Sequence, residues 1–180
     1  MPHYFAYGAN MDRDAMAVRC PGSRPLGIAR LARHRFIITR DGYASVIRDP
    51  RAMVHGVIWD LALADIPSLD RFEECAKGLY IKINQGVLTE AGPRRALVYV
   101  GTDAEAGAPK PRYLEAVIAS AESWRLPEAY RHELTRLLSG TGGLRRSAPA
   151  AMPGLQPRAP APRTTLGVPP RARGAWRWQP

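Results

Sequence analysis

The carboxylate of Glu73 is the strongest candidate for chemistry in this sequence, because helical periodicity aims it at the protein interior. In the segment ADIPSLDRFEEC, residues 64–75, the buried side of a short helix is defined by Ile66, Leu69 and Phe72 at about 100° per residue. Glu73 falls between the directions of Ile66 and Leu69. Burial raises the pKa of a carboxyl group, which suits proton transfer near neutral pH. Such a group is either used in this way or satisfied by a structural hydrogen bond.

The other charged residues of this helix are expected to be more exposed. Glu74 and Arg71 point toward solvent on the same helical wheel, and Asp70 lies at the boundary. Asp65 stands just before a proline, where it is placed to cap the helix. The periodicity therefore singles out Glu73 as the inward acid.

A turn near the amino terminus, in the segment YFAYGANM at residues 4–11, offers Glu73 a partner. Gly8, Ala9 and Asn10 join an expected strand to an expected helix, so their backbone N–H groups converge near a helix start and can bind an anion. Gly8 permits a positive φ or a close approach of a ligand, and Ala9 leaves room for it. Asn10 either contacts a ligand or caps the helix.

Three blocks of the chain, in order, resemble the motifs of the gamma-glutamylcyclotransferase family, which belongs to the wider AIG2-like group. YFAYGANM is similar to the Tyr-Gly-Ser-Asn signature of the family. The second block matches Leu-Asp-x-x-Glu followed by Gly and Tyr, and the third matches Pro-x-Pro-x-Tyr and then Leu-Pro-x-x-Tyr. The matching residues are Leu69, Asp70, Glu73, Gly78 and Tyr80, then Pro109, Pro111, Tyr113, Leu126, Pro127 and Tyr130. The match covers residues 3 to about 138.

This resemblance implies a compact β-barrel with flanking helices and a cofactor-free reaction. In that reaction a small-molecule γ-glutamyl amide is cut to 5-oxoproline and a free amine or amino acid, and no metal is expected. By position, Glu73 resembles the catalytic acid/base. The substrate-binding residues that the resemblance implies are Tyr7, Gly8, Ala9, Asn10, Met11, Tyr99 and Tyr113.

The chain departs from the family motifs at three places. Ala9 replaces the usual Ser and removes a hydroxyl that could help hold a ligand. Glu74 replaces a common Gly and adds a charge that would raise the pKa of Glu73 if the two carboxylates are close. Trp124 and Arg125 precede Leu-Pro where a Gly is more usual. These changes bear on substrate choice more than on the presence of the site.

Two other functions stay open at this stage. One is a cyclotransferase that acts on a γ-glutamyl amine, or removes a protecting γ-glutamyl group from a small-molecule product. It would share every catalytic residue and differ only on the leaving-group side. The other is a non-catalytic ligand-binding module whose basic carboxyl-terminal segment binds nucleic acid, with an affinity that falls steeply with salt.

The elements that must position these residues read as strands first and helices later. The fold class is therefore α+β, with a small, mostly antiparallel sheet that is closed or strongly curved and carries flanking helices. Asp41-Gly42 is a hairpin signal. The expected strands span residues 3–8, 26–31, 34–40, 43–49, 53–61, 79–89 and 94–101, and the expected helices span 11–20, 64–75, 112–124 and 127–138.

Composition and charge divide the chain into a domain at residues 1–138 and a basic Pro- and Arg-rich segment at 139–180, which we expect to be disordered. From residue 140 onward there are seven arginines and no acid, so this segment supplies most of the net charge of +10. We do not expect it to have a dedicated nucleic-acid partner. The first residues lack a signal-peptide pattern and no run is long enough to span a membrane, so we expect a cytoplasmic monomer or homodimer. Cys20 and Cys75 are too few for a disulfide framework and lack metal-ligand spacing.

Overall fold

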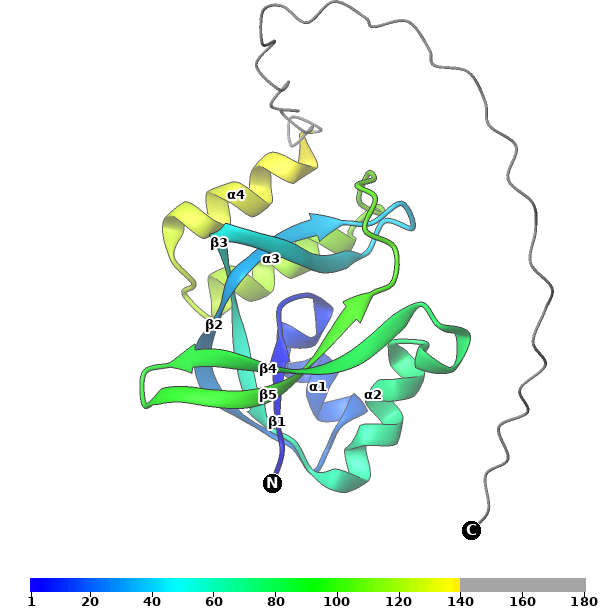
Figure 1. Cartoon of the computed structure of the whole chain (residues 1–180), viewed down its shortest axis with the longest axis vertical. Helices are drawn as coiled ribbons and strands as arrows, with labels where there is room; N and C mark the ends of the chain where they lie inside the picture. The colour runs from blue at the N-terminus through cyan, green and yellow to red at the C-terminus, as the bar shows by residue number, and fades with distance from the viewer. Residues whose placement is uncertain (140–180) are drawn as a thin grey trace, which may run out of the picture. The chain divides into compact units, whose positions relative to one another are not determined.

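Two long strands, β2 (Arg24–Ile38) and β3 (Ala44–Asp60), form the hairpin on which the fold is built (Figure 1). They meet at the predicted Asp41-Gly42 turn, where the Thr39 N–H donates to the Tyr43 carbonyl at 2.8 Å and Gly42 has φ 82°. The hairpin prediction is therefore confirmed. The computed structural model describes residues 1–139.

The sequence pattern divided each of these strands into two, and this was wrong. The register of β2 against β3 shifts between Pro25 and Gly27 and again between Ala32 and His34. Arg33, at the second shift, has a left-handed φ of 61°. A β-bulge inserts a residue and reverses the side-chain alternation without ending the strand. The predicted strand ends near residues 31–34 and 49–53 are therefore irregularities within continuous strands.

The sheet closes into a barrel with the order β1-β3-β2-β4-β5, which confirms the predicted fold class for the described residues. β4 (Tyr80–Thr89) and β5 (Gly92–Gly101) form a second antiparallel hairpin. The first strand, β1 (His3–Ala6), lies antiparallel to β3 and parallel to β5, with His3 opposite Ala96. β1 therefore closes the barrel, and its last three residues are buried. The turn that follows it begins inside the protein.

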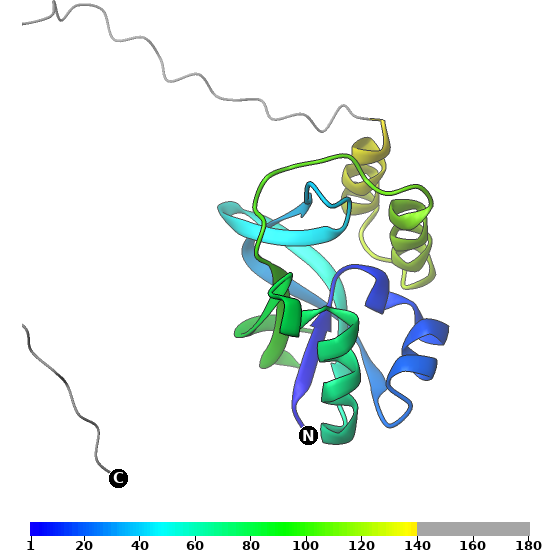
Figure 2. The ribbon, with the colours of Figure 1, turned by 90° about the vertical axis from the view of Figure 1, so that its right-hand side faces the viewer.

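Helices cover two parts of the barrel (Figures 1 and 2). α1 (Arg13–Arg19) and α2 (Ile66–Phe72) lie side by side, and α3 (Tyr113–Ser123) packs on α4 (Glu128–Leu138). Short 3-10 helices complete the fold at Ala9–Met11, Leu63–Asp65 and Cys75–Lys77. No helix within residues 1–139 is long and apolar enough to cross a membrane. The predicted basic segment lies, apart from Ser139, outside the described residues.

The ends of α1 and α2 differ from the predicted ones for local reasons. α1 starts at Arg13 because Asp12, not Asn10, is its cap, with the Asp12 carboxylate accepting from the Ala15 N–H at 2.8 Å. Asp65 does precede α2, but its carboxylate accepts from Gly22 N at 3.0 Å and Ser23 Oγ at 2.7 Å and makes no cap hydrogen bond. Asn10 is thereby free for another role.

Candidate active site

A cavity of about 340 Å³ lies where the first turn, α2 and the barrel meet. All but one of the site residues predicted from the sequence are part of the cavity wall. They are Tyr7, Gly8, Ala9, Asn10, Glu73, Tyr99 and Tyr113. The exception is Met11, whose side chain is fully buried and whose N–H donates to the Gly8 carbonyl at 3.0 Å. The structure therefore does not bring Met11 to the cavity with the other predicted site residues. The N–H of Met11 is hydrogen-bonded within the 3-10 turn, and its side chain packs in the core.

Glu73 is directed into this cavity although the helix ends just before it. It is the C-cap residue of α2, and its N–H donates to the Leu69 carbonyl at 2.9 Å. Its Oε1 accepts a hydrogen bond from Asn10 Nδ2 at 2.8 Å. Burial raises the pKa of Glu73 to about 7, against the opposing effects of the Arg19 charge and the Asn10 hydrogen bond. This group can exchange a proton near neutral pH.

The Asn10 carboxamide is held in one orientation by three neighbours. Its Nδ2 donates to Glu73 and also to the Tyr4 hydroxyl, the latter at 2.9 Å. Its Oδ1 accepts from Nη1 of Arg19. Because a guanidinium only donates hydrogen bonds, Arg19 keeps the amide oxygen on its own side and the NH₂ group toward Glu73. Periodicity and motifs in the sequence gave no signal for Arg19.

The helical position of Phe72 predicts a side chain in the core, but Phe72 is not in the core, and Arg19 explains why. The Phe72 side chain is 44% exposed and lines the cavity. The Arg19 guanidinium carbon lies 3.4 Å from the centre of its ring, a cation–π contact that favours a ring accessible from outside the core. On this helix Leu69 is fully buried.

At Gly8 the structure shows a close approach of the Tyr113 side chain, and the backbone does not have a positive φ. Gly8 has φ −118°, which any residue adopts. A Cβ at this position would lie 3.1 Å from the Tyr113 hydroxyl and 3.3 Å from Ala44 Cβ. The absence of a side chain at Gly8 therefore lets Tyr113 reach the turn.

The cavity tyrosines fall into two groups by what their hydroxyls do. Tyr7 and Tyr99 donate within the protein, to the Tyr99 carbonyl and to Asp70 Oδ1 respectively, each at 2.6 Å. Tyr4 and Tyr113 accept, from Asn10 Nδ2 and from the Ala44 N–H at 3.2 Å. Burial raises the pKa of Tyr113 to about 12, so its hydroxyl keeps its proton. Tyr4 and Tyr113 can thus donate to a ligand, and Tyr4 was missed because its strand position predicts core packing alone.

Two further cavity residues belong to the second motif block: Glu74, which departs from the family motif, and Tyr80, which matches it. Glu74 adopts a left-handed conformation with φ 51°, which favours glycine and accounts for the common Gly there. Its carboxylate pairs with Lys77 Nζ at 2.7 Å. The raised pKa of Glu73 comes from burial, and Glu74 is not among its causes. Tyr80, from the second motif block, donates to the Ala44 carbonyl at 2.7 Å.

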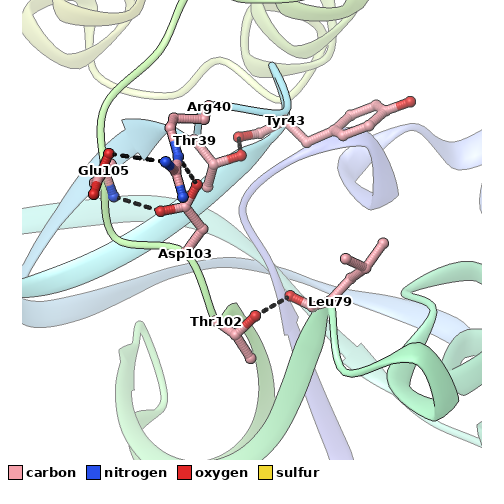
Figure 3. Close-up of polar contacts among 7 residues, drawn as sticks. All are labelled: Thr39, Arg40, Tyr43, Leu79, Thr102, Asp103 and Glu105. Atoms are coloured by element: carbon pink, nitrogen blue, oxygen red, sulfur yellow. Dashed lines mark hydrogen bonds and ion pairs between the residues drawn. The ribbon is translucent and has the colours of Figure 1, made fainter.

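The outer walls of the cavity are tied together by the segment 102–112 between β5 and α3. Figure 3 shows Arg40 paired with Asp103 at 3.1 Å and with Glu105 at 3.3 Å, and Thr102 Oγ1 donating to the Leu79 carbonyl at 3.2 Å. The segment thus joins the β2–β3 hairpin to the start of β4. Within residues 1–139, no group of three or more His, Cys, Asp or Glu residues is arranged to hold a metal ion.

Comparison with known proteins agrees with the resemblance seen in the sequence. The AIG2-like family model matches residues 53–134. Gamma-glutamylcyclotransferase from Homo sapiens is 28% identical over an alignment of 142 residues, and the match covers 73% of this chain and 76% of that protein. The Bos taurus gamma-glutamylcyclotransferase is 27% identical over 145 residues, covering 74% and 77% of the two chains.

Solved structures share the fold. A gamma-glutamyl cyclotransferase structure superposes with a TM-score of 0.70 at 26% identity, covering 74% of this chain and 86% of its own. An uncharacterized protein from Homo sapiens gives a TM-score of 0.69 at 27% identity, covering 74% and 85%. The sequence motifs, the barrel and these relatives all point to one family.

Proposed function

We propose that this chain, which is similar to the AIG2-like family and to gamma-glutamylcyclotransferases, cuts γ-glutamyl amides to 5-oxoproline and a free amine or amino acid, with Glu73 as general acid/base. One observation carries the proposal. A partly buried carboxyl group with a pKa raised to about 7 faces a cavity and is held by Asn10 of the amino-terminal turn.

The substrate supplies the nucleophile for this reaction. The α-amine nitrogen forms a bond to the γ-carbonyl carbon, and the bond from that carbon to the amide nitrogen then breaks. The products are a five-membered lactam and a free amine. The protein therefore needs no nucleophilic Ser or Cys. It must fold the substrate, move protons and stabilise the oxyanion, and orientation alone contributes up to roughly 7–11 kcal/mol in favourable intramolecular reactions.

Glu73 would move the proton in both halves of the reaction. Its carboxylate takes a proton from the α-ammonium group, which frees the amine to attack, and the resulting carboxylic acid protonates the departing nitrogen. The attacking nitrogen loses a second proton as the lactam forms, and that proton ends on the released amine, which leaves as an ammonium ion. A pKa near 7 suits both steps because the two protonation states are then close in free energy. Such a shuttle typically contributes about 10²- to 10⁴-fold to the rate.

The remaining polar groups of the cavity would bind the substrate. We assign the polar groups of the substrate to the turn at Gly8, Ala9 and Asn10 and to the hydroxyl donors of Tyr4 and Tyr113. The turn holds either the α-carboxylate or the developing oxyanion, and the loss of one oxyanion donor elsewhere costs about 10²- to 10³-fold. Arg19 is a positioning residue in this scheme, since it fixes Asn10 through a hydrogen bond and its charge lowers the pKa of Glu73.

The test is incubation of the full chain with γ-glutamyl-alanine and with a γ-glutamyl alkylamine while 5-oxoproline is measured. N-acetyl-γ-glutamyl-alanine is the matched control because its amine is blocked. We expect 5-oxoproline from at least one free-amine substrate and no release of alanine from the acetylated one. Binding of the substrates without release of 5-oxoproline would contradict the proposal and support a binding module. Equal release of alanine from the acetylated substrate would show hydrolysis instead of cyclisation.

A further inference from the structure

We propose that the outer part of the cavity is a subsite for the leaving group and that it prefers an uncharged, apolar side chain there. This inference rests on the proposed function and specifies its substrate class. The subsite consists of Tyr43, Phe72 and Leu79, which we call the mouth residues. All three line the cavity and are exposed, at 39%, 44% and 41%.

The cavity has a buried polar end and an exposed apolar end. At the buried end, Tyr4, Tyr7 and Asn10 are exposed by only 3%, 6% and 3%. The hydroxyl and amide donors of the site gather there beside Glu73. A glutamyl group carries an α-ammonium and an α-carboxylate, which need such polar partners when they leave water. With the glutamyl group at the polar end, the group on the far side of the scissile amide lies against the mouth residues.

The charges around the mouth disfavour an anionic side chain on the leaving group. Among the described residues that line the cavity, only Glu73 and Glu74 carry a charge, and both are acids. The cations beside the mouth already have partners: Lys77 pairs with Glu74, Arg19 stacks on Phe72 and donates to Asn10, and Lys110 Nζ lies 2.9 Å from the Tyr43 hydroxyl and 4.2 Å from its ring centre. A carboxylate side chain at the mouth would compete with these contacts and would meet the two acids.

Contacts on both walls restrain the mouth, which favours discrimination of side chains by size. Leu79 is anchored through its carbonyl, which accepts from the Thr102 N–H at 3.0 Å and from Thr102 Oγ1 at 3.2 Å. On the other wall Tyr43 packs edge-on to Tyr113, with ring centres 5.2 Å apart. Figure 3 shows Leu79 next to Thr102, and Tyr43 on the hairpin near Arg40, whose ion pairs with Asp103 and Glu105 hold the segment 102–112 to the hairpin. The Leu79 side chain itself takes no part in this anchoring.

The inference is tested by comparing kcat/KM for γ-glutamyl-leucine, γ-glutamyl-alanine and γ-glutamyl-aspartate, read by 5-oxoproline release. An apolar pocket that encloses one more methylene discriminates by roughly tenfold or more, and a half-open mouth by less. We expect leucine to exceed alanine by about fivefold or more, and aspartate to be the poorest of the three. Equal values for leucine and alanine, or a preference for aspartate, would overturn the inference.

The variant Leu79→Asn tests whether the mouth residues determine the preference for the leucine substrate over the alanine substrate. The ratio of the leucine to the alanine substrate should fall to about twofold or below, because a polar amide replaces an apolar wall of similar size. Leu88→Asn is the matched control, since Leu88 is 39% exposed on β4, the strand that begins just after Leu79, but does not line the cavity, and it should keep the wild-type ratio. Leu79→Ala replaces the first variant if thermal unfolding shows that it does not fold.

The outcomes separate this inference from the proposed function. An unchanged ratio in both Leu79 variants would overturn the subsite while leaving the cyclotransferase activity in place. Absence of 5-oxoproline from all three substrates with the wild-type protein would remove the activity, and the subsite with it.

Discussion

Replacing Glu73 with Gln should make the protein more stable at neutral and alkaline pH while removing the group on which the chemistry depends. Burial raises the pKa of Glu73 from 4.5 to about 7 in the folded state. At about 1.4 kcal/mol for each pKa unit, ionising this carboxyl group costs the fold up to roughly 3 kcal/mol. Gln keeps the acceptor for Asn10 without a charge that must be buried.

The sign of the pH dependence follows from proton binding. Between pH 4.5 and about 7 the folded state binds more protons at Glu73 than the unfolded state, so the free energy of unfolding falls as pH rises through this window. The difference between Glu73→Gln and wild type should therefore be smallest below pH 4.5. It should grow to about 3 kcal/mol above pH 7. The pKa of His55 is lowered by burial and by Arg30, so its contribution to the free energy of unfolding rises with pH. This contribution is the same in both proteins and cancels when the variant is compared with wild type.

The assay is urea unfolding of both proteins from pH 4 to 8.5, with the variant-minus-wild-type difference plotted against pH. Glu74→Gln is the matched control because Glu74 is paired with Lys77 at the surface, and surface pairs contribute about 0–1 kcal/mol. Its difference from wild type should stay small across the range. A flat difference curve for Glu73→Gln, or a variant less stable than wild type at pH 8, would refute the assignment of Glu73 as a buried titrating acid.

Three further substitutions probe the groups around Glu73. Arg19→Met keeps an apolar contact with the Phe72 ring but removes the donor to Asn10, so kcat/KM should fall about 10- to 100-fold. Its pH profile should move to higher pH because Arg19 lowers the pKa of Glu73, and an unmoved profile would show a merely structural role. Glu74→Gly should raise the free energy of unfolding by roughly 0.5–1 kcal/mol in urea, since φ is 51°, and Glu74→Ala should give no such gain. Tyr113→Phe leaves the Ala44 N–H without its acceptor, at a cost of about 1–3 kcal/mol in stability, and should also raise KM; an unchanged KM would make the hydroxyl structural only.

The barrel and the inward acid could be predicted because both follow from local patterns. Alternation in β4 and β5 reflects strands with one buried face, whereas β1 is a short apolar run whose last three residues are all buried. Glu73 was placed by the direction of Leu69, and a residue one step beyond the helix end still continues roughly in the helical direction. The bulges in β2 and β3 could not be seen, because an inserted residue reverses alternation and resembles a strand end.

The parts of the site that the sequence did not reveal depend on contacts between distant residues. Arg19 is 54 positions from Glu73 along the chain, and its role follows from the packing of α1 beside α2. The same packing exposes Phe72, which a helical wheel places inward. Tyr43 and Leu79 resemble ordinary exposed residues until the segment 102–112 joins their two walls.

The most direct test of the central claim is a single-turnover experiment with wild type and Glu73→Gln on a γ-glutamyl amide that the wild type cleaves. Substrate binding is measured in parallel to show that the variant keeps the cavity. We predict that Glu73→Gln binds the substrate and stays folded while its rate of 5-oxoproline formation falls by about 10²-fold or more. Formation of 5-oxoproline at the wild-type rate by a folded Glu73→Gln protein would contradict the claim that this carboxyl group transfers the proton.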